Sequence, residues 1–172
     1  TIHFVLPPDV DASVTKLGAN NVAEQVGATV FSHWVNEEFI HTNNKTVRDP
    51  NGKSIANPIR KALREAPRGL CIKPISHGLN EYDHYQKVAA LAITQPDNRQ
   101  VSRVAQLSGL TIQEVRRTFR IMSVYQTVCR TEIRVKGSTA PIEVIVLDKA
   151  AAMELADIFE GSTVAGQLGD VQ

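Results

Sequence analysis

The chain has 172 residues, of which 42% are hydrophobic and 22% charged, and its formal net charge at pH 7 is +1. This composition is typical of a globular protein with a buried core, and it excludes fibrous, low-complexity and intrinsically disordered classes. No apolar run reaches the roughly 18 to 20 residues of a membrane-spanning helix, and no signal-peptide pattern opens the sequence. We therefore expect a cytoplasmic protein. Because the sequence begins at Thr1 and not at Met, we also expect a fragment or a processed product.

The first forty residues contain one strand candidate and one helix candidate. Residues 2–6 are apolar and precede Pro7-Pro8, which predicts a short strand. Residues 21–40 have apolar residues at helical spacing, which predicts a long helix interrupted only by Gly27. Trp34, the single tryptophan, is expected to anchor the core from this helix.

A hairpin, a helix and a strand are predicted next. Residues 46–55 surround an Asp-Pro-Asn-Gly sequence, which favours a tight turn between two strands. Residues 59–66 predict a helix with Asn57 as its cap and Pro58 in its first turn, and residues 70–75 predict a strand. We interpret residues 1–78 as a small α+β module that ends at a domain boundary near residues 77–80. This module is expected to supply dimer contacts or a second DNA contact, the latter through Arg60, Lys61 and Arg64.

Catalytic and metal-binding patterns are weak in this sequence. His33, Glu37 and His41 follow one another at four-residue intervals, but the trio drifts around the predicted helix and has no fourth ligand. Cys71 and Cys129 stand apart without metal-ligand spacing, so we expect buried reduced thiols. Phosphate loops, nucleophile elbows and paired acidic clusters are also missing from the sequence. We therefore expect no cofactor, no metal and no enzymatic activity.

Residues 100–122 form the most informative stretch of the sequence, because their pattern is typical of a helix-turn-helix. Val104, Ala105 and Leu107 give a short helix an apolar side, and Gly109 suits a turn that requires positive φ. Thr111 and Glu114 then have the spacing of a capping box that opens a second helix.

The second helix is predicted to have an apolar side and a basic side. Its apolar positions, Ile112, Val115, Phe119 and Met122, share one face. The opposite face contains Gln113, Arg117 and Arg120, with Arg116 at its edge. Glutamine and arginine suit the hydrogen-bonding edges of adenine and guanine, so we expect this face to point outward and to contact bases.

Two further strands and a helix are predicted around this motif. Residues 127–135 and 141–147 are rich in β-branched residues, and the loop between them predicts a wing. Residues 81–94 predict a preceding helix with Asn80 as its cap. From residue 80 to 147 the chain therefore resembles the winged helix-turn-helix superfamily. This resemblance implies a DNA-binding winged domain over residues 79–160 and an α+β fold for the whole chain.

The C-terminal end is predicted to hold one helix and a flexible tail. Asp148 is placed to cap a helix over residues 149–159, whose apolar residues recur at helical spacing. Residues 161–172 show little apolar periodicity and predict a flexible tail.

The distribution of charge favours nucleic-acid binding. Between residues 99 and 136 there are eight basic and two acidic residues, a net charge of +6, which leaves −5 for the rest of the chain. We therefore expect a sequence-specific protein that binds double-stranded DNA, as a transcriptional regulator or as a plasmid or phage replication or maintenance factor. A homodimer and further domains of the same polypeptide are compatible with this expectation. The alternatives are a protein-interaction module and, with less support, a small DNA-processing enzyme. The expected DNA contacts are made by Arg103, Gln113, Arg116, Arg117, Arg120, Arg130, Arg134, Lys136 and Thr139.

Overall fold

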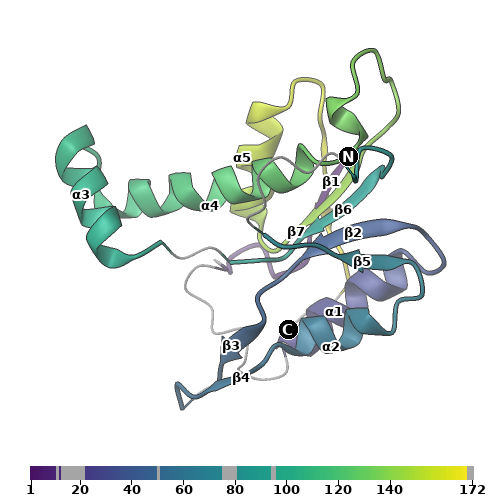
Figure 1. The fold of residues 1–172 in the computed structure, drawn as a ribbon, viewed down its shortest axis with the longest axis horizontal. Coiled ribbons are helices and arrows are strands. Elements are labelled where there is room, and N and C mark those ends of the chain that lie inside the picture. The colour runs from purple at the N-terminus through teal and green to yellow at the C-terminus, as the bar shows by residue number, and fades with distance from the viewer. Residues whose placement is uncertain (11, 13–21, 50, 75–80, 94–95, 170–172) are drawn as a thin grey trace.

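A six-stranded parallel sheet forms the centre of the protein in the computed structural model (Figure 1). The structure describes all residues except 11, 13–21, 50, 75–80, 94–95 and 170–172. In the sheet the strands lie in the order β5-β2-β6-β7-β1-β8, and every pairing is parallel. Their bounds are β1 (Ile2–Phe4), β2 (Phe39–Thr42), β5 (Gly69–Cys71), β6 (Lys87–Ala90), β7 (Glu143–Val146) and β8 (Val164–Gln167). A separate antiparallel hairpin pairs β3 (Thr46–Arg48) with β4 (Ser54–Ala56).

Helices cover both faces of this sheet. One face is covered by α1 (Val22–His33) and α2 (Pro58–Arg64), which pack against each other. The other face is covered by α4 (Ile112–Val128) and α5 (Lys149–Ile158), while α3 (Asn98–Ser108) stands away from the sheet (Figure 1). Each face has its own hydrophobic cluster: Val26, Val30 and Ile145 are buried in the first, and Val124, Val128 and Leu155 in the second. The protein is thus a mixed α/β domain with a doubly wound sheet.

Strands from the first and second halves of the sequence lie side by side in the same sheet. β6 lies between β2 and β7, and β1 lies between β7 and β8. The boundary predicted near residues 77–80 lies outside the described residues, but it does not divide the sheet. One sheet instead takes strands from the predicted module at 1–78 and from the predicted domain at 79–160.

Several predicted elements are confirmed. The strand at residues 2–6, the hairpin at 46–55 and the strand at 70–75 correspond to β1, β3–β4 and β5. The helix expected at 59–66 is α2, with Asn57 as its cap and Pro58 in its first turn. The helix expected at 149–159 is α5, with Asp148 as its cap.

One predicted helix is too long, and the predicted flexible tail is wrong. The helix predicted over residues 21–40 ends at His33, and Phe39 and Ile40 instead begin β2. The tail predicted over residues 161–172 contains β8, which pairs with β1 at the edge of the sheet. Two of the four β8 residues are polar or glycine, so the sequence lacks the apolar run typical of a buried parallel strand.

The predicted wing and first helix are also wrong, and a winged helix is not shown. Residues 81–84 form a turn and Lys87–Ala90 form β6, where a helix was expected over 81–94. Residues 127–135 complete α4 and form a 3₁₀ turn at Glu132–Arg134, so the first wing strand is missing. The second, over 141–147, does form β7, but its neighbours are β6 and β1. β-Branched residues occupy the end of α4 because they pack against the sheet, a tertiary effect that outweighs local propensity.

Gly27 lies where α1 and α2 approach most closely, and it gives a stability prediction. A Cβ at this position would lie 2.7 Å from Cβ of Ala62 and 3.2 Å from Cα of Ile59. Gly27→Ala is therefore expected to lower the free energy of unfolding by about 1 to 3 kcal/mol through overpacking. Helix propensity alone would give the opposite sign, a gain of about 0.5 to 1 kcal/mol.

Urea unfolding of Gly27→Ala, of Ser32→Ala and of the double variant Gly27→Ala/Ala62→Gly tests this prediction. Ser32 is exposed on the same helix, so its variant should stay within about 0.5 kcal/mol of the wild type. The double variant removes the closest contact and should recover part of the loss. A stabilised Gly27→Ala protein would contradict the close approach.

Candidate functional site

The predicted helix-turn-helix is formed by α3 and the first turns of α4, which together we call the α3–α4 hairpin. Gly109 ends α3 with a φ of 73°. Thr111 caps α4, and its side chain and that of Glu114 form the predicted capping box. The hydrogen bonds from Thr111 hold the pKa of Glu114 below its ordinary value. Local sequence therefore determines the turn and the start of α4, as predicted.

The α3–α4 hairpin projects beyond the sheet (Figure 1). Val101 in α3 and Val115 in α4 are its buried apolar residues. Leu107 is 79% exposed, and Leu110 and Ile112 are also exposed. The apolar side predicted for this motif is thus only partly covered, because the elements that would cover it in a winged helix are not formed.

α4 buries different faces along its length. Near its start it packs on α3 through Val115. Toward its end it packs on the sheet and α5 through Val124, Thr127 and Val128. Because a residue lies about 100° further round the helix than the one before it, Val124 falls on the side of Gln113 and Arg117, opposite Val115. The predicted outward face of α4 is therefore the face that turns toward the body of the protein.

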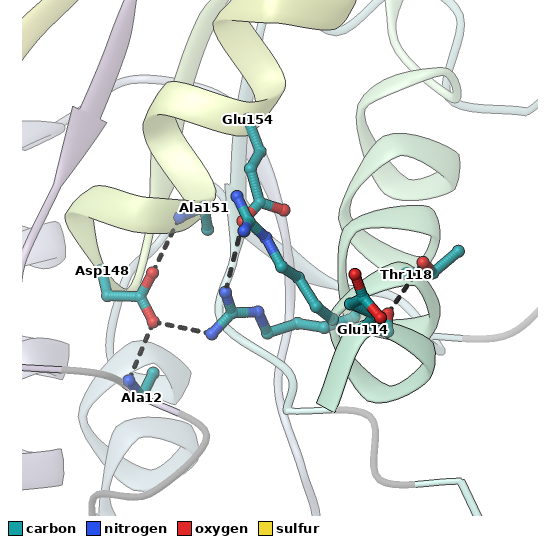
Figure 2. A network of polar contacts seen from close by, with 8 residues as sticks. Ala12, Glu114, Thr118, Asp148, Ala151 and Glu154 are labelled. Atoms are coloured by element: carbon teal, nitrogen blue, oxygen red, sulfur yellow. Dashed lines mark hydrogen bonds and ion pairs between the residues drawn. The ribbon is translucent and has the colours of Figure 1, made fainter. Parts of the chain in front are cut away.

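Two of the arginines expected to contact bases take part in ion pairs with α5. Arg117 pairs with Glu154, and Arg120 pairs with both Asp148, at 3.2 Å, and Glu154, at 3.8 Å. Figure 2 shows Asp148 at the start of α5, where it also accepts hydrogen bonds from the backbone N–H groups of Ala12 and Ala151, each at 2.8 Å. The side chain of Arg120 is only 12% exposed, so its guanidinium faces Asp148 and Glu154 and not the outward direction expected of a base contact. Arg117 remains largely exposed beyond its ion pair.

Arg130 is buried, contrary to its predicted role in contacting the DNA backbone. Its guanidinium donates to the carbonyl oxygens of Lys73, at 2.7 Å, and of Pro74, at 3.4 Å. Burial lowers its pKa, although Tyr82 acts in the opposite direction. Arg130 thus joins the end of α4 to the segment after β5, a structural role.

The remaining predicted contacts separate into two groups at opposite ends of α4. Arg103, Gln113 and Arg116 are exposed on the α3–α4 hairpin. Arg134, Lys136 and Thr139 are exposed beyond the other end. α4 has 17 residues and therefore separates the two groups by about 25 Å. The single recognition surface predicted from the sequence is not formed.

The hairpin carries three exposed basic side chains. Arg99 and Arg103 lie one turn apart on α3, and both are exposed. Arg116 of α4 is exposed and donates to Oδ1 of Asn98, at 2.8 Å, in the first turn of α3. We call Arg99, Arg103 and Arg116 the basic hairpin cluster.

Two polar side chains are buried where β2 ends. His41 lies 2.9 Å from the amide nitrogen of Asn43 through its Nδ1. Burial, with a smaller effect from the charge of Arg60, lowers the pKa of His41 to about 4. Oδ1 of Asn43 has no hydrogen-bond partner among the residues that the structure describes. Ligands of doubly wound domains commonly bind at the carboxyl ends of the strands, where this pair lies.

The histidine trio considered from the sequence is not brought together. Glu37 pairs with Nζ of Lys87 at 3.1 Å, and His41 is buried beside Asn43. His33 instead meets His3 and Glu143, and ligand atoms of these three residues lie within 4.8 Å of one another. No spacing pattern in the sequence marks this cluster, because its members come from β1, α1 and β7 and meet only in the folded protein.

The two cysteines are free, but they are not buried as predicted. Cys71 is exposed at the end of β5, and Cys129 is partly exposed after α4. Among the described residues, no helix has the length and apolar character needed to cross a membrane.

Comparison of the chain with family models, curated proteins and solved structures finds no significant match.

Proposed function

We propose that the protein binds double-stranded DNA through the α3–α4 hairpin, as a DNA-binding module of a regulatory or DNA-processing protein. The observation that carries this proposal is the exposure of the basic hairpin cluster on α3 and the start of α4, which stand clear of the sheet (Figure 1). Arginine side chains on such an element can reach phosphates without obstruction by the rest of the domain.

The proposed contacts differ from those expected of a winged helix. Arg99, Arg103 and Arg116 contact phosphates, and Gln113 in the first turn of α4 is the exposed side chain best suited to a base edge. Arg117 and Arg120 hold α4 on α5 through Glu154 and Asp148. The contribution of Arg134, Lys136 and Thr139 depends on whether the duplex runs along α4, since they lie about 25 Å from the hairpin.

Fluorescence anisotropy with a labelled 30-bp duplex at several salt concentrations tests this function. Binding that neutralises three phosphates should give a slope of about −2.7 in a plot of log K against log salt. Arg103→Ala should weaken binding to all sequences and reduce that slope by about 1. Lys136→Ala tests whether the residues beyond the end of α4 contribute to DNA binding.

Arg48→Ala is the matched control, because Arg48 is an exposed arginine in β3, away from the hairpin. Its variant should bind as the wild type does. Salt-independent binding, or equal losses for Arg48→Ala and Arg103→Ala, would contradict the proposal.

A second candidate function is docking of a partner protein on the same hairpin. It is favoured by the exposure of Leu107, Leu110 and Ile112 around the turn, since apolar side chains grouped on a projecting element are typical of interaction surfaces. Leu107→Ser distinguishes the two functions: it should leave DNA binding unchanged if phosphates are the target. Loss of DNA binding in Leu107→Ser, with folding intact, would show that the apolar turn is part of the same interface.

A further inference from the structure

His3, His33 and Glu143 converge on one face of the sheet, next to the end of α1. His3 is opposite Ile145 in the register of β1 and β7, and Glu143 lies two residues before Ile145 on the same strand. Because side chains alternate along a strand, His3, Glu143 and Ile145 all point to the same face, and Ile145 packs in the cluster beneath α1. His33, the last residue of α1, meets them there.

The distances among the three side chains are close to those of a metal site. Nε2 of His33 lies 2.7 Å from Oε1 of Glu143, and Nε2 of His3 lies 3.1 Å from the same oxygen. Two ligands on a tetrahedral Zn²⁺, with bonds of about 2.1 Å, lie about 3.4 Å apart. Side-chain adjustments of less than about 1 Å would therefore admit the ion between the two imidazoles and the carboxylate.

A neighbouring side chain orients the Glu143 carboxylate, as residues around a metal site commonly orient the ligands of the metal. Nε1 of Trp34 donates to Oε2 of Glu143 at 3.0 Å, which leaves Oε1 directed at the histidines. Groups that hold ligands in this way are typical of metal centres in proteins. Burial alone would raise the pKa of Glu143, but hydrogen bonds from His33 and Trp34, together with the charges of His33 and His3, outweigh it and hold this pKa below its ordinary value.

The cluster is reachable from solvent. The exposed fractions of the side chains are 14% for His3, 29% for His33 and 26% for Glu143. An ion can therefore enter, and water can fill a fourth position, as in zinc sites with three protein ligands. Two imidazoles and one carboxylate suit Zn²⁺ better than Mg²⁺ or Ca²⁺, which prefer oxygen ligands.

We propose that His3, His33 and Glu143 bind one Zn²⁺ ion, which fastens the end of α1 to β1 and β7. The proposal is independent of DNA binding, because the site lies on the opposite face of the sheet from α4 and α5. Without the ion, Glu143 accepts hydrogen bonds from the same imidazoles, and this arrangement is the competing explanation of the geometry.

Thermal unfolding of tag-free protein, first treated with a chelator and then titrated with Zn²⁺, tests the site. Binding to the folded state alone should raise Tm by about 5 to 10 °C at a hundredfold excess over Kd. Mg²⁺ at the same concentration should produce no shift. Co²⁺ in place of Zn²⁺ should give the visible absorption bands of a tetrahedral centre.

Glu143→Gln and His33→Ala should each weaken Zn²⁺ binding at least about 10-fold and abolish the Co²⁺ bands. His84→Ala removes an exposed histidine outside the cluster and should bind Zn²⁺ as the wild type does. Circular dichroism of Glu143→Gln, which keeps the side-chain shape, establishes that a loss is not unfolding. The proposal is overturned if Zn²⁺ leaves Tm unchanged, or if Glu143→Gln and His84→Ala respond to it equally. Loss of binding on Cys71→Ser alone would likewise overturn it.

Discussion

Asp148→Ala is expected to lower the free energy of unfolding by about 3 to 5 kcal/mol. Asp148 is 1% exposed, and its carboxylate pairs with Arg120 while accepting hydrogen bonds from Ala12 and Ala151. The substitution removes the cap of α5, leaves a buried N–H without its acceptor and deprives the Arg120 guanidinium of a buried counter-charge. Urea unfolding followed by circular dichroism measures the loss.

Asp157→Ala is the control for this prediction, since Asp157 is exposed on the same helix. It should stay within about 0.5 kcal/mol of the wild type. The double variant Arg120→Met/Asp148→Ala should lose less than the sum of its single variants, because the charge that Asp148 compensates is gone. A loss below about 1 kcal/mol in Asp148→Ala would show that this network contributes little.

The second large effect is a loss of stability in acid caused by His41. Its pKa is about 4 in the folded protein and 6.5 when unperturbed. The unfolded chain therefore binds a proton more readily as the pH falls below 6.5, and folding stability decreases with it. The contribution of the uncharged His41 side chain to folding stability is fully present above pH 6.5, and about 3 kcal/mol of this stability is lost by pH 4.

His41→Gln removes this titration while keeping a polar, uncharged side chain beside Asn43. Free energies of unfolding measured from pH 7.5 to pH 4 should fall less steeply for His41→Gln than for the wild type. The difference in free energy of unfolding between the two proteins should be constant above pH 6.5. Below pH 6.5 the wild type should lose stability relative to His41→Gln. Parallel curves over the whole range would mean that His41 titrates normally in the folded protein.

The sequence predicted elements well where local chemistry determines them. Asn57 and Pro58 begin α2, Thr111 and Glu114 begin α4, and Asp148 begins α5, because each cap satisfies backbone N–H groups within its own turn. The β3–β4 hairpin likewise depends on its turn residues. None of these signals requires a distant part of the chain.

The parallel sheet was harder to predict because its pairings connect distant residues. β6 and β7 are buried on both faces, so their sequences lack the alternation of apolar and polar residues that marks a half-exposed strand. The apolar residues of β6 therefore fit the helix predicted over residues 81–94. The same limitation affected the site. The basic pattern on α4 is visible in the sequence, but Glu154, which pairs with Arg117 and Arg120, is more than thirty residues away, so the sequence alone does not show that these arginines face α5.

The position of β1 has a consequence for how the protein folds. Residues 2–4 pair on one side with residues 144–146 and on the other with residues 164–167. β1 is therefore synthesised well before either of its neighbours, and both pairings close loops of well over a hundred residues. Folding should be slow and cooperative, with β1 exposed in any intermediate that forms from the first half of the chain. A nascent or truncated chain would expose Ile2 and Phe4 on an unpaired, aggregation-prone strand until β7 and β8 pair with it.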